Sequence, residues 1–277
     1  MTDLLAEVRS LLFAPGDDER KLRGAIGSAA DVVIADLEDA VLPARKEEAR
    51  NTVARVFTEA PRNGLRAVRI GALGTEDAEA DLRVLASIET DFVVVPKADP
   101  ATLGRLSGGP PAIALVETPA GLRRAHDLAS APPVVALMLG PVDLSASLGL
   151  EPRDDGLELL HARSTLVLDS AAAGLTAPID GPRLDFRDAA ALRHEVELAR
   201  SLGFGAKACI HPDQLVVVND GFTETDERIE WARRVVAAFE SSEGGATALD
   251  GTMVDEPVVA RARRTLARAC ARKKERR

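Results

Sequence analysis

The chain has 277 residues, a formal net charge of −9, 46% hydrophobic and 29% charged residues, and two cysteines. This composition is typical of a globular protein with a large core and excludes a disordered chain. The negative charge argues against a nucleic-acid-binding protein, and two cysteines are too few for a disulfide framework. We find no signal-peptide pattern and no apolar stretch near the roughly 18 residues of a membrane span, so we expect a cytoplasmic protein without a membrane partner.

Eight short, β-rich runs recur along the chain, and most are continuous in Val, Ile, Leu and Ala. In chain order they cover residues 9–14, 31–36, 65–70, 91–96, 111–116, 134–139, 175–179 and 206–210. Apolar runs without polar alternation predict strands that are buried on both faces, as in a parallel sheet covered by helices.

Segments of helical composition separate these runs, at residues 17–30, 43–60, 75–88, 119–129, 156–173 and 188–202. Thr75 before Glu76 and Asp77 is typical of a helix start, and Pro43 and Pro119 suit first-turn positions. Eight strands alternating with helices predict an α/β fold, the (β/α)₈ or TIM barrel, which often has this length as one domain.

The sequence changes character after the eighth run. A helix is predicted near 224–240, residues 241–245 have the composition of a flexible linker, and a helix follows from about residue 257 to the basic end at 272–277. We therefore expect a barrel domain over 1–240 and a separate appendage over 241–277. The basic end has two interpretations, contact with a cofactor phosphate or a solvated helix end that complements the helix dipole.

Polar side chains follow nearly every predicted strand, where the catalytic groups of such barrels are found. They are Asp36, Glu38, Asp39, Arg69, Lys97, Glu117, Asp143, Asp180 and His211. A buried charge is costly unless it is paired or bound to a metal, so this gathering of charges indicates a shared purpose.

Glu117 and Asp143 are the predicted metal ligands. They follow neighbouring strands, and no His or Cys stands near them to complete a softer site. Two carboxylates at the rim of a parallel sheet suit Mg²⁺ with several water or substrate ligands. The alternative is that each carboxylate caps the helix that follows it.

The other candidates have more than one interpretation. Arg69 has a guanidinium that can hold a carboxylate or an enolate oxygen, or can simply pair with the acidic cluster at 36–39. Lys97 is a binding group or a counter-ion, or a Schiff-base nucleophile if burial lowers its pKa. His211 is a third metal ligand, a base, or a hydrogen-bonded histidine at the end of the barrel.

The chain closely resembles the citrate lyase beta-subunit family, within the wider group of malyl-CoA and citramalyl-CoA lyases and HpcH/HpaI aldolases. The likeness runs from about residue 9 to residue 268. The residues that carry it are SLLFAPG (10–16), ADVVIADLEDAV (30–41), VRI (68–70), VPK (95–97), ALVETPAG (114–121), IHP (210–212) and GTMVD (251–255), with Lys46, Ala49, Arg50, Gly140, Asp143, Leu144 and Gln214.

This resemblance implies an Mg²⁺-dependent carbon-carbon lyase that cleaves a 3-hydroxyacyl thioester of the citryl-, malyl- or citramalyl-CoA type. It assigns the metal to Glu117 and Asp143. The resemblance further implies that residues 241–277 form a linker and a lid that lies over a neighbouring subunit, in a homotrimer or hexamer. Catalytic roles fall to Arg69, Asp255, Asp36 and Glu38, with Asp255 of the lid as acid/base, and substrate-binding roles to Arg69, Lys97, Asp39, Gly140 and Pro141.

Two departures from the family pattern leave the acyl group open. Gly71 stands where many relatives have Asn, and Pro141-Val142 replaces a frequent Ala-Glu. The substrate is expected to be a thioester of free CoA or of an acyl-carrier protein. Alternative functions are a 2-keto acid aldolase, a malate-synthase-like enzyme that also hydrolyses the thioester, and a non-catalytic thioester-binding subunit.

Overall fold

The computed structural model describes residues 4–242 and 245–275, and side chains as far as residue 269. The chain forms two compact units, Met1–Phe222 and Thr223–Arg277. Within the described residues, no helix has the length and apolar character that crossing a membrane requires.

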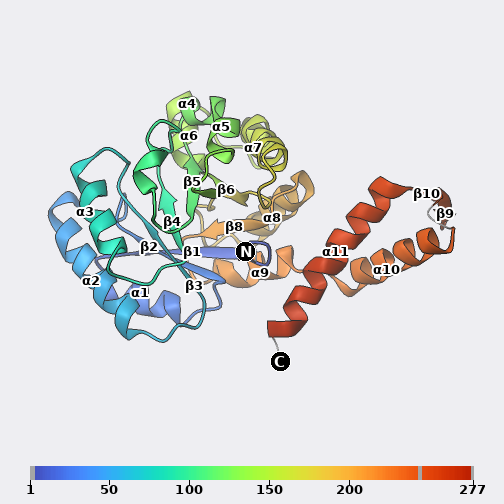
Figure 1. Ribbon diagram of the computed structural model, residues 1–277, viewed down its shortest axis with the longest axis horizontal. Helices are drawn as coiled ribbons and strands as arrows, with labels where there is room; N and C mark the ends of the chain where they lie inside the picture. Colours follow the sequence, from blue (N-terminus) through green and yellow to red (C-terminus); the bar gives the residue numbers. More distant parts are fainter. Residues whose placement is uncertain (1–3, 243–244, 276–277) are drawn as a thin grey trace. The chain divides into compact units, whose positions relative to one another are not determined.

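The first unit is a closed barrel of eight parallel strands, and the (β/α)₈ prediction is confirmed (Figure 1). Each strand pairs with the next in the sequence, and β1 pairs with both β2 and β8 to close the ring. The strands are β1 Ser10–Pro15, β2 Val32–Asp36, β3 Leu65–Arg69, β4 Phe92–Val95, β5 Ala112–Val116, β6 Val134–Leu139, β7 Ile179–Asp180 and β8 Ala206–Cys209.

Both faces of the strands are buried, in two separate cores. In β2, for example, Val32 and Ile34 pack inside the barrel, whereas Val33 and Ala35 pack against the surrounding helices. Side chains alternate between the two faces of a strand, so every second residue points into the barrel. This alternation decides which strand-end residues reach the barrel mouth.

Helices surround the barrel (Figure 1). They are α1 Glu19–Ile26, α2 Lys46–Glu59, α3 Glu76–Leu85, α4 Pro119–Arg123, α5 Ala125–Ala129, α6 Pro141–Leu148, α7 Leu160–Ala172, α8 Ala189–Leu202 and α9 Gln214–Phe222, with the short 3₁₀ helices η1 Pro43–Arg45, η2 Leu103–Leu106 and η3 Leu157–Leu159. The predicted helix at 119–129 is divided at Arg124. Helices α6 and α9 were not predicted.

Strand β7 is shorter than the predicted run at 175–179. It contains Ile179 and Asp180 alone, and its pairing with β6 consists of Met138 opposite Ile179. Leu175 instead closes the end of α7, because its N–H donates to the carbonyl of Ser170 at 2.9 Å. The part of the run before Ile179 is therefore a connection and not a strand.

The second unit is a helical hairpin made of α10 Asp226–Ser241 and α11 Glu256–Glu275, joined by the antiparallel pair β9 Thr247–Leu249 and β10 Thr252–Val254 (Figure 1). Its own core contains residues of both helices and of β10. Helix α10, which the sequence analysis placed in the barrel domain, packs on α11, so the boundary between the units precedes α10. Residues 243 and 244 of the predicted linker and the side chains of the basic end lie outside the described residues.

Candidate functional site

A cavity of about 330 Å³ lies at the carboxyl ends of the barrel strands. Its charged lining comes from Asp36, Asp39, Arg69, Glu117 and Asp143, and Gly140 and Pro141 also contribute. Its apolar lining includes Phe13, Leu115, Met138, Val142, Leu184 and Ile210. Most of the strand-end residues predicted to act together therefore share one cavity.

The alternation of the strands explains why the charged residues face this cavity. Ile34, Ala67 and Leu115 all belong to the core inside the barrel. Asp36, Arg69 and Glu117 lie two residues after them, on the same inward face and at the carboxyl ends of β2, β3 and β5. Three charged side chains thus occupy the top layer of the barrel interior.

Arg69 is held in place by Asp36. Its Nε donates to Asp36 Oδ1 at 2.7 Å, its Nη2 donates to Asp36 Oδ2, and its guanidinium lies 5.0 Å from the centre of the Phe13 ring. Burial opposes the positive charge, but Asp36 and the acidic residues that follow it outweigh this effect, so the pKa of Arg69 lies above its ordinary value. The guanidinium is therefore a permanent cation with a fixed orientation. Phe13, whose ring lies against it, was not predicted from the sequence to belong to the site.

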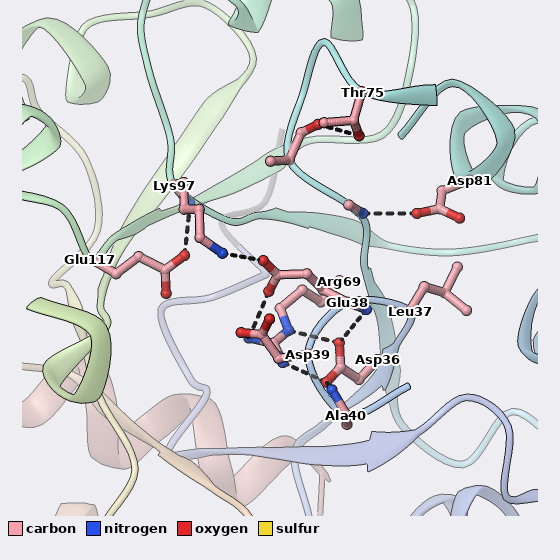
Figure 2. Close-up of polar contacts among 12 residues, drawn as sticks. Asp36, Leu37, Glu38, Asp39, Ala40, Arg69, Thr75, Asp81, Lys97 and Glu117 are labelled. Atoms are coloured by element: carbon pink, nitrogen blue, oxygen red, sulfur yellow. Dashed lines mark hydrogen bonds and ion pairs between the residues drawn. The ribbon is translucent and has the colours of Figure 1, made fainter. Parts of the chain in front are cut away.

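Glu38 connects Arg69 to Lys97. One oxygen, Oε1, accepts a hydrogen bond from Lys97 Nζ at 2.5 Å, and the other, Oε2, lies 3.1 Å from Arg69 Nη1 (Figure 2). Asp39 is farther away, 3.9 Å from the same Nη1. Burial raises the pKa of Glu38, and the two cations offset only part of that effect.

The pKa of Lys97 argues against a Schiff-base role. Burial lowers this pKa, but the hydrogen bond to Glu38 and the attraction of nearby carboxylates more than offset it, so the net shift is upward. A Schiff-base lysine needs the opposite shift, because the neutral amine is the nucleophile. The counter-ion interpretation of Lys97 agrees with this geometry.

Glu117 is a buried carboxylate with one oxygen held by the backbone. It is 2% exposed, and its Oε1 accepts a hydrogen bond from the Lys97 N–H at 2.8 Å. Burial raises its pKa to about 7, and the negative charges of Glu38 and Asp143 add to this effect. Gly140 lies against it so closely that a Cβ there would be 2.8 Å from Glu117 Oε2 and 2.3 Å from Glu117 Cβ.

Glu117 and Asp143, the predicted Mg²⁺ ligands, line the same cavity. Asp143 lies in the first turn of α6, lines the same cavity and acts electrostatically on Glu117. No group of three or more His, Cys, Asp or Glu side chains in the described part of the chain is arranged to hold a metal. The protein therefore offers two carboxylates, and a divalent ion would both offset the cost of burying Glu117 and keep places for water or substrate oxygens.

The capping alternative does not hold for either carboxylate. The N-cap of α4 is Thr118, whose side chain accepts from the Gly121 N–H, and the N-cap of α6 is Gly140. Both acids therefore remain available to a ligand.

Asp180 and His211 do not join the charged cluster. Ile179 points into the barrel, so Asp180 points outward, where it pairs with Lys207 at 2.6 Å and Arg163 at 3.1 Å. Burial opposes its charge, but these cations lower the pKa of Asp180 overall. His211 stacks on Phe186 with ring centres 4.4 Å apart and does not line the cavity. The prediction that Asp180 and His211 act together with the other charged residues at the strand ends was therefore wrong.

Asp255 belongs to the second unit, where it directly precedes α11. Its Oδ1 accepts from the Val258 N–H at 3.3 Å, and its carbonyl accepts from the Val259 N–H at 3.0 Å. Its acid/base role stays a prediction.

The two departures from the family pattern have local structural effects. The Gly71 N–H donates to Asp81 Oδ2 at 2.8 Å, and a Cβ at Gly71 would be 3.2 Å from the N of Ala78 in α3. A larger residue there requires a shift of α3. Val142 is exposed and lines the cavity with an apolar side chain.

A family model described as HpcH/HpaI aldolase/citrate lyase matches residues 9–212. The chain is 41% identical over 263 residues to the citrate lyase subunit beta-like protein of Mycobacterium tuberculosis, covering 93% of this chain and 94% of that protein. It is 37% identical over 269 residues to the (3S)-malyl-CoA thioesterase of Cereibacter sphaeroides, with 94% of each covered. The crystal structure of CitE from M. tuberculosis in complex with magnesium, acetoacetate and coenzyme A matches it with a TM-score of 0.85 and 40% identity, covering 96% of this chain and 99% of that one.

Proposed function

This chain belongs to the HpcH/HpaI aldolase/citrate lyase family, and we propose that it is an Mg²⁺-dependent carbon-carbon lyase that cleaves a 3-hydroxyacyl-CoA thioester to acetyl-CoA and a keto acid. The observation that carries this proposal is the pair of carboxylates, Glu117 and Asp143, in one cavity with the fixed guanidinium of Arg69. The mycobacterial relative binds magnesium, a keto acid and CoA together, which is the set of species that this reaction involves.

Each residue of the cavity has a distinct part in the proposed cleavage. Glu117 and Asp143 hold Mg²⁺, which supplies Lewis-acid polarisation of the substrate's hydroxyl and carboxylate oxygens. Arg69 donates hydrogen bonds to oxygens that gain negative charge, and Asp36 and Glu38 keep its guanidinium in position. Asp39, Gly140 and Pro141, which line the cavity, are the further substrate-binding candidates, whereas Lys97, the other residue expected to bind substrate, contacts Glu117 and Glu38.

The reaction is a retro-Claisen or retro-aldol cleavage. The substrate hydroxyl gives its proton to water, the carbon-carbon bond next to it breaks as the hydroxyl oxygen becomes the carbonyl oxygen of the keto acid, and the electron pair of that bond passes to the thioester as an acetyl-CoA enolate. Asp255 then protonates the enolate carbon, or removes that proton in the condensation direction. In this proposal the lid of a neighbouring subunit supplies Asp255, so the active protein is a homotrimer or hexamer. Its proposed location is the cytoplasm, because the chain has only two cysteines and no disulfide framework.

A specific observation keeps the thioesterase as the second candidate. The relative from C. sphaeroides is named a (3S)-malyl-CoA thioesterase and matches 94% of this chain. Hydrolysis differs from cleavage in its products, because it releases free CoA and a hydroxy acid with the carbon skeleton intact.

One assay separates these candidates. The purified protein is incubated with citryl-, malyl-, citramalyl- and 3-hydroxy-3-methylglutaryl-CoA, with Mg²⁺ or with EDTA, and acetyl-CoA, keto acid and free CoA are measured. We expect Mg²⁺-dependent release of acetyl-CoA together with a keto acid from at least one ester. Free CoA without a keto acid indicates the thioesterase, and binding of acetyl-CoA without turnover of any ester indicates a non-catalytic subunit.

A further inference from the structure

Lys97 has a backbone conformation that is unusual for a lysine. Its φ is 46°, a value in the left-handed region where Cβ crowds the backbone and glycine is favoured. Lys97 follows Pro96, and a proline before a residue with positive φ is the pattern of a type II turn, whose third position usually holds glycine or asparagine. The chain therefore carries a long charged side chain at a position suited to glycine, directly after β4.

This conformation directs the two ends of Lys97 to two different carboxylates. The backbone N–H donates to Glu117 Oε1 at 2.8 Å, and Nζ donates to Glu38 Oε1 at 2.5 Å (Figure 2). Rotation about the N–Cα bond is what φ measures, so the left-handed value sets the direction of the side chain relative to the N–H. Strained backbone that persists at a site usually serves that site.

The contacts continue from Glu38 to Arg69. Glu38 Oε2 lies 3.1 Å from Arg69 Nη1, and Arg69 is in turn fixed by Asp36. A continuous series of contacts through Lys97 and Glu38 thus joins the carboxylate of Glu117 to the guanidinium of Arg69. We propose that Lys97 is a positioning residue that fixes the metal-binding carboxylate of Glu117 and the substrate-binding guanidinium of Arg69 relative to one another. This inference rests on the proposed function for the roles of Glu117 and Arg69.

Two further observations favour positioning over direct contact with substrate. Glu117 and Arg69 line the cavity, whereas Lys97 is not among the lining residues that the structure describes. The hydrogen bond from the Lys97 N–H is made to Oε1 of Glu117. The other oxygen, Oε2, faces Gly140, which has no side chain to crowd it, and so remains open to a metal ion. Partners that orient metal ligands in this way typically change metal affinity about 10–100-fold when they are removed.

Two substitutions distinguish the role of the Lys97 backbone conformation from the role of its ammonium group. Lys97→Gly keeps the N–H and suits the left-handed turn, but it removes the ammonium. Lys97→Val removes the ammonium and also opposes the turn, because β-branched side chains are disfavoured at positive φ. If Lys97→Val does not fold, Lys97→Ala tests the same step with less strain. Lys97→Arg keeps a cation that can reach Glu38.

The experiment measures Mg²⁺ binding by calorimetry without substrate, and steady-state kinetics on the ester that the parent protein cleaves. We expect Lys97→Gly to bind Mg²⁺ within about threefold of the parent but to lose roughly tenfold or more in kcat, because Glu38 loses the ammonium partner that holds it against Nη1 of Arg69. Lys97→Val should lose kcat as Lys97→Gly does and, in addition, should bind Mg²⁺ at least about tenfold more weakly than the parent. Lys97→Arg should regain most of the kcat that Lys97→Gly loses.

Other results overturn the inference. It fails if Lys97→Val, or Lys97→Ala in its place, binds Mg²⁺ like the parent, or if Lys97→Arg does not restore kcat. It also fails if Lys97→Gly raises KM and leaves kcat unchanged, because that result is expected for a group that only binds substrate. Glu117→Gln is the control for the proposed function itself. If the parent binds no Mg²⁺, or if Glu117→Gln binds it equally well, the metal site is wrong whatever the Lys97 variants do.

Discussion

Asp36 and Arg69 occupy paired positions at the carboxyl ends of β2 and β3, and the Asp36 carboxylate accepts hydrogen bonds from both Nε and Nη2 of Arg69. Asp36 is 1% exposed, and the Arg69 side chain is 13% exposed. A two-point contact between planar groups fixes orientation as well as distance. The remaining nitrogen, Nη1, is the one near Glu38 and Asp39.

Replacing Asp36 by Asn should impair both folding stability and catalysis. The loss of one partner leaves a buried charge without full compensation, so we expect the free energy of unfolding to fall by about 3 kcal/mol. We expect kcat/KM to fall roughly tenfold or more, because Arg69 is no longer oriented. Asp39→Asn is the control for stability, since its carboxylate is exposed and 3.9 Å from Arg69; it should change stability by less than about 0.5 kcal/mol. Equal losses of stability would contradict the role of Asp36.

A methyl group at residue 140 should damage the metal site without unfolding the barrel. In Gly140→Ala the new Cβ would lie 2.3 Å from Glu117 Cβ, so Glu117 has to move. We expect Mg²⁺ affinity, measured by calorimetry, to fall at least about tenfold. Gly24→Ala in α1 is the matched control, because no atom lies within 4 Å of its new methyl group, and it should leave Mg²⁺ affinity unchanged. Unchanged affinity in Gly140→Ala would show that Glu117 does not bind the ion.

Mg²⁺ binding should depend on pH through Glu117. Burial raises the pKa of this carboxyl from 4.5 to about 7 in the metal-free protein, and Mg²⁺ requires the ionised form. We therefore expect Mg²⁺ affinity to fall about tenfold for each pH unit below about 7 and to level off above it. Calorimetry in buffers of different ionisation enthalpy should also detect release of a proton near pH 6. A flat affinity between pH 5.5 and pH 8 would argue against Glu117 as a ligand.

The same shift predicts how the stability of the metal-free protein varies with pH. Between pH 4.5 and about 7 the folded protein holds a proton on Glu117 that the unfolded chain has lost. The contribution of Glu117 to the free energy of unfolding should therefore fall as pH rises through this interval and stay constant above it. Glu117→Gln should remove this dependence, and denaturant unfolding of both proteins in EDTA measures the difference.

Substitution of Asp255 should separate chemistry from metal binding. Asp255→Asn keeps a side chain that can accept the N-cap hydrogen bond from Val258, so α11 should remain folded. We expect turnover to fall by roughly a hundredfold or more, as for loss of a general acid, with Mg²⁺ affinity unchanged. A large loss of Mg²⁺ affinity would count against the acid/base assignment.

The barrel and most of the mouth residues were predictable from the sequence. Continuous apolar runs defined the strands, and the ends of those runs placed Asp36, Arg69 and Glu117 at one edge. Asp180 was misplaced because an apolar run shows where a strand lies but not which residues point inward. The direction of the Asp180 side chain depends on the two-residue strand β7, and the sequence did not reveal where that strand starts.

Other features depend on contacts across space or on weak local signals. Helix α9 contains, directly after Gln214, a Leu-Val-Val-Val segment that has β propensity, and packing of the helix overrides it. Asp250-Gly251 is a hairpin signal, and both residues do have positive φ in the β9–β10 turn, but the flanking strands are three residues each. The pKa of Glu117 and the turn at Lys97 depend on neighbours from other strands.

The most direct test of the magnesium site is a crystal structure of the protein grown with Mn²⁺ in place of Mg²⁺ and a keto acid, with anomalous scattering recorded to locate the metal. The proposed function predicts one strong anomalous peak within about 2.3 Å of carboxylate oxygens of both Glu117 and Asp143, with the keto acid bound to the ion and near Arg69. A crystal with the cavity free of metal, or with the peak on other ligands while these carboxylates point elsewhere, would contradict it.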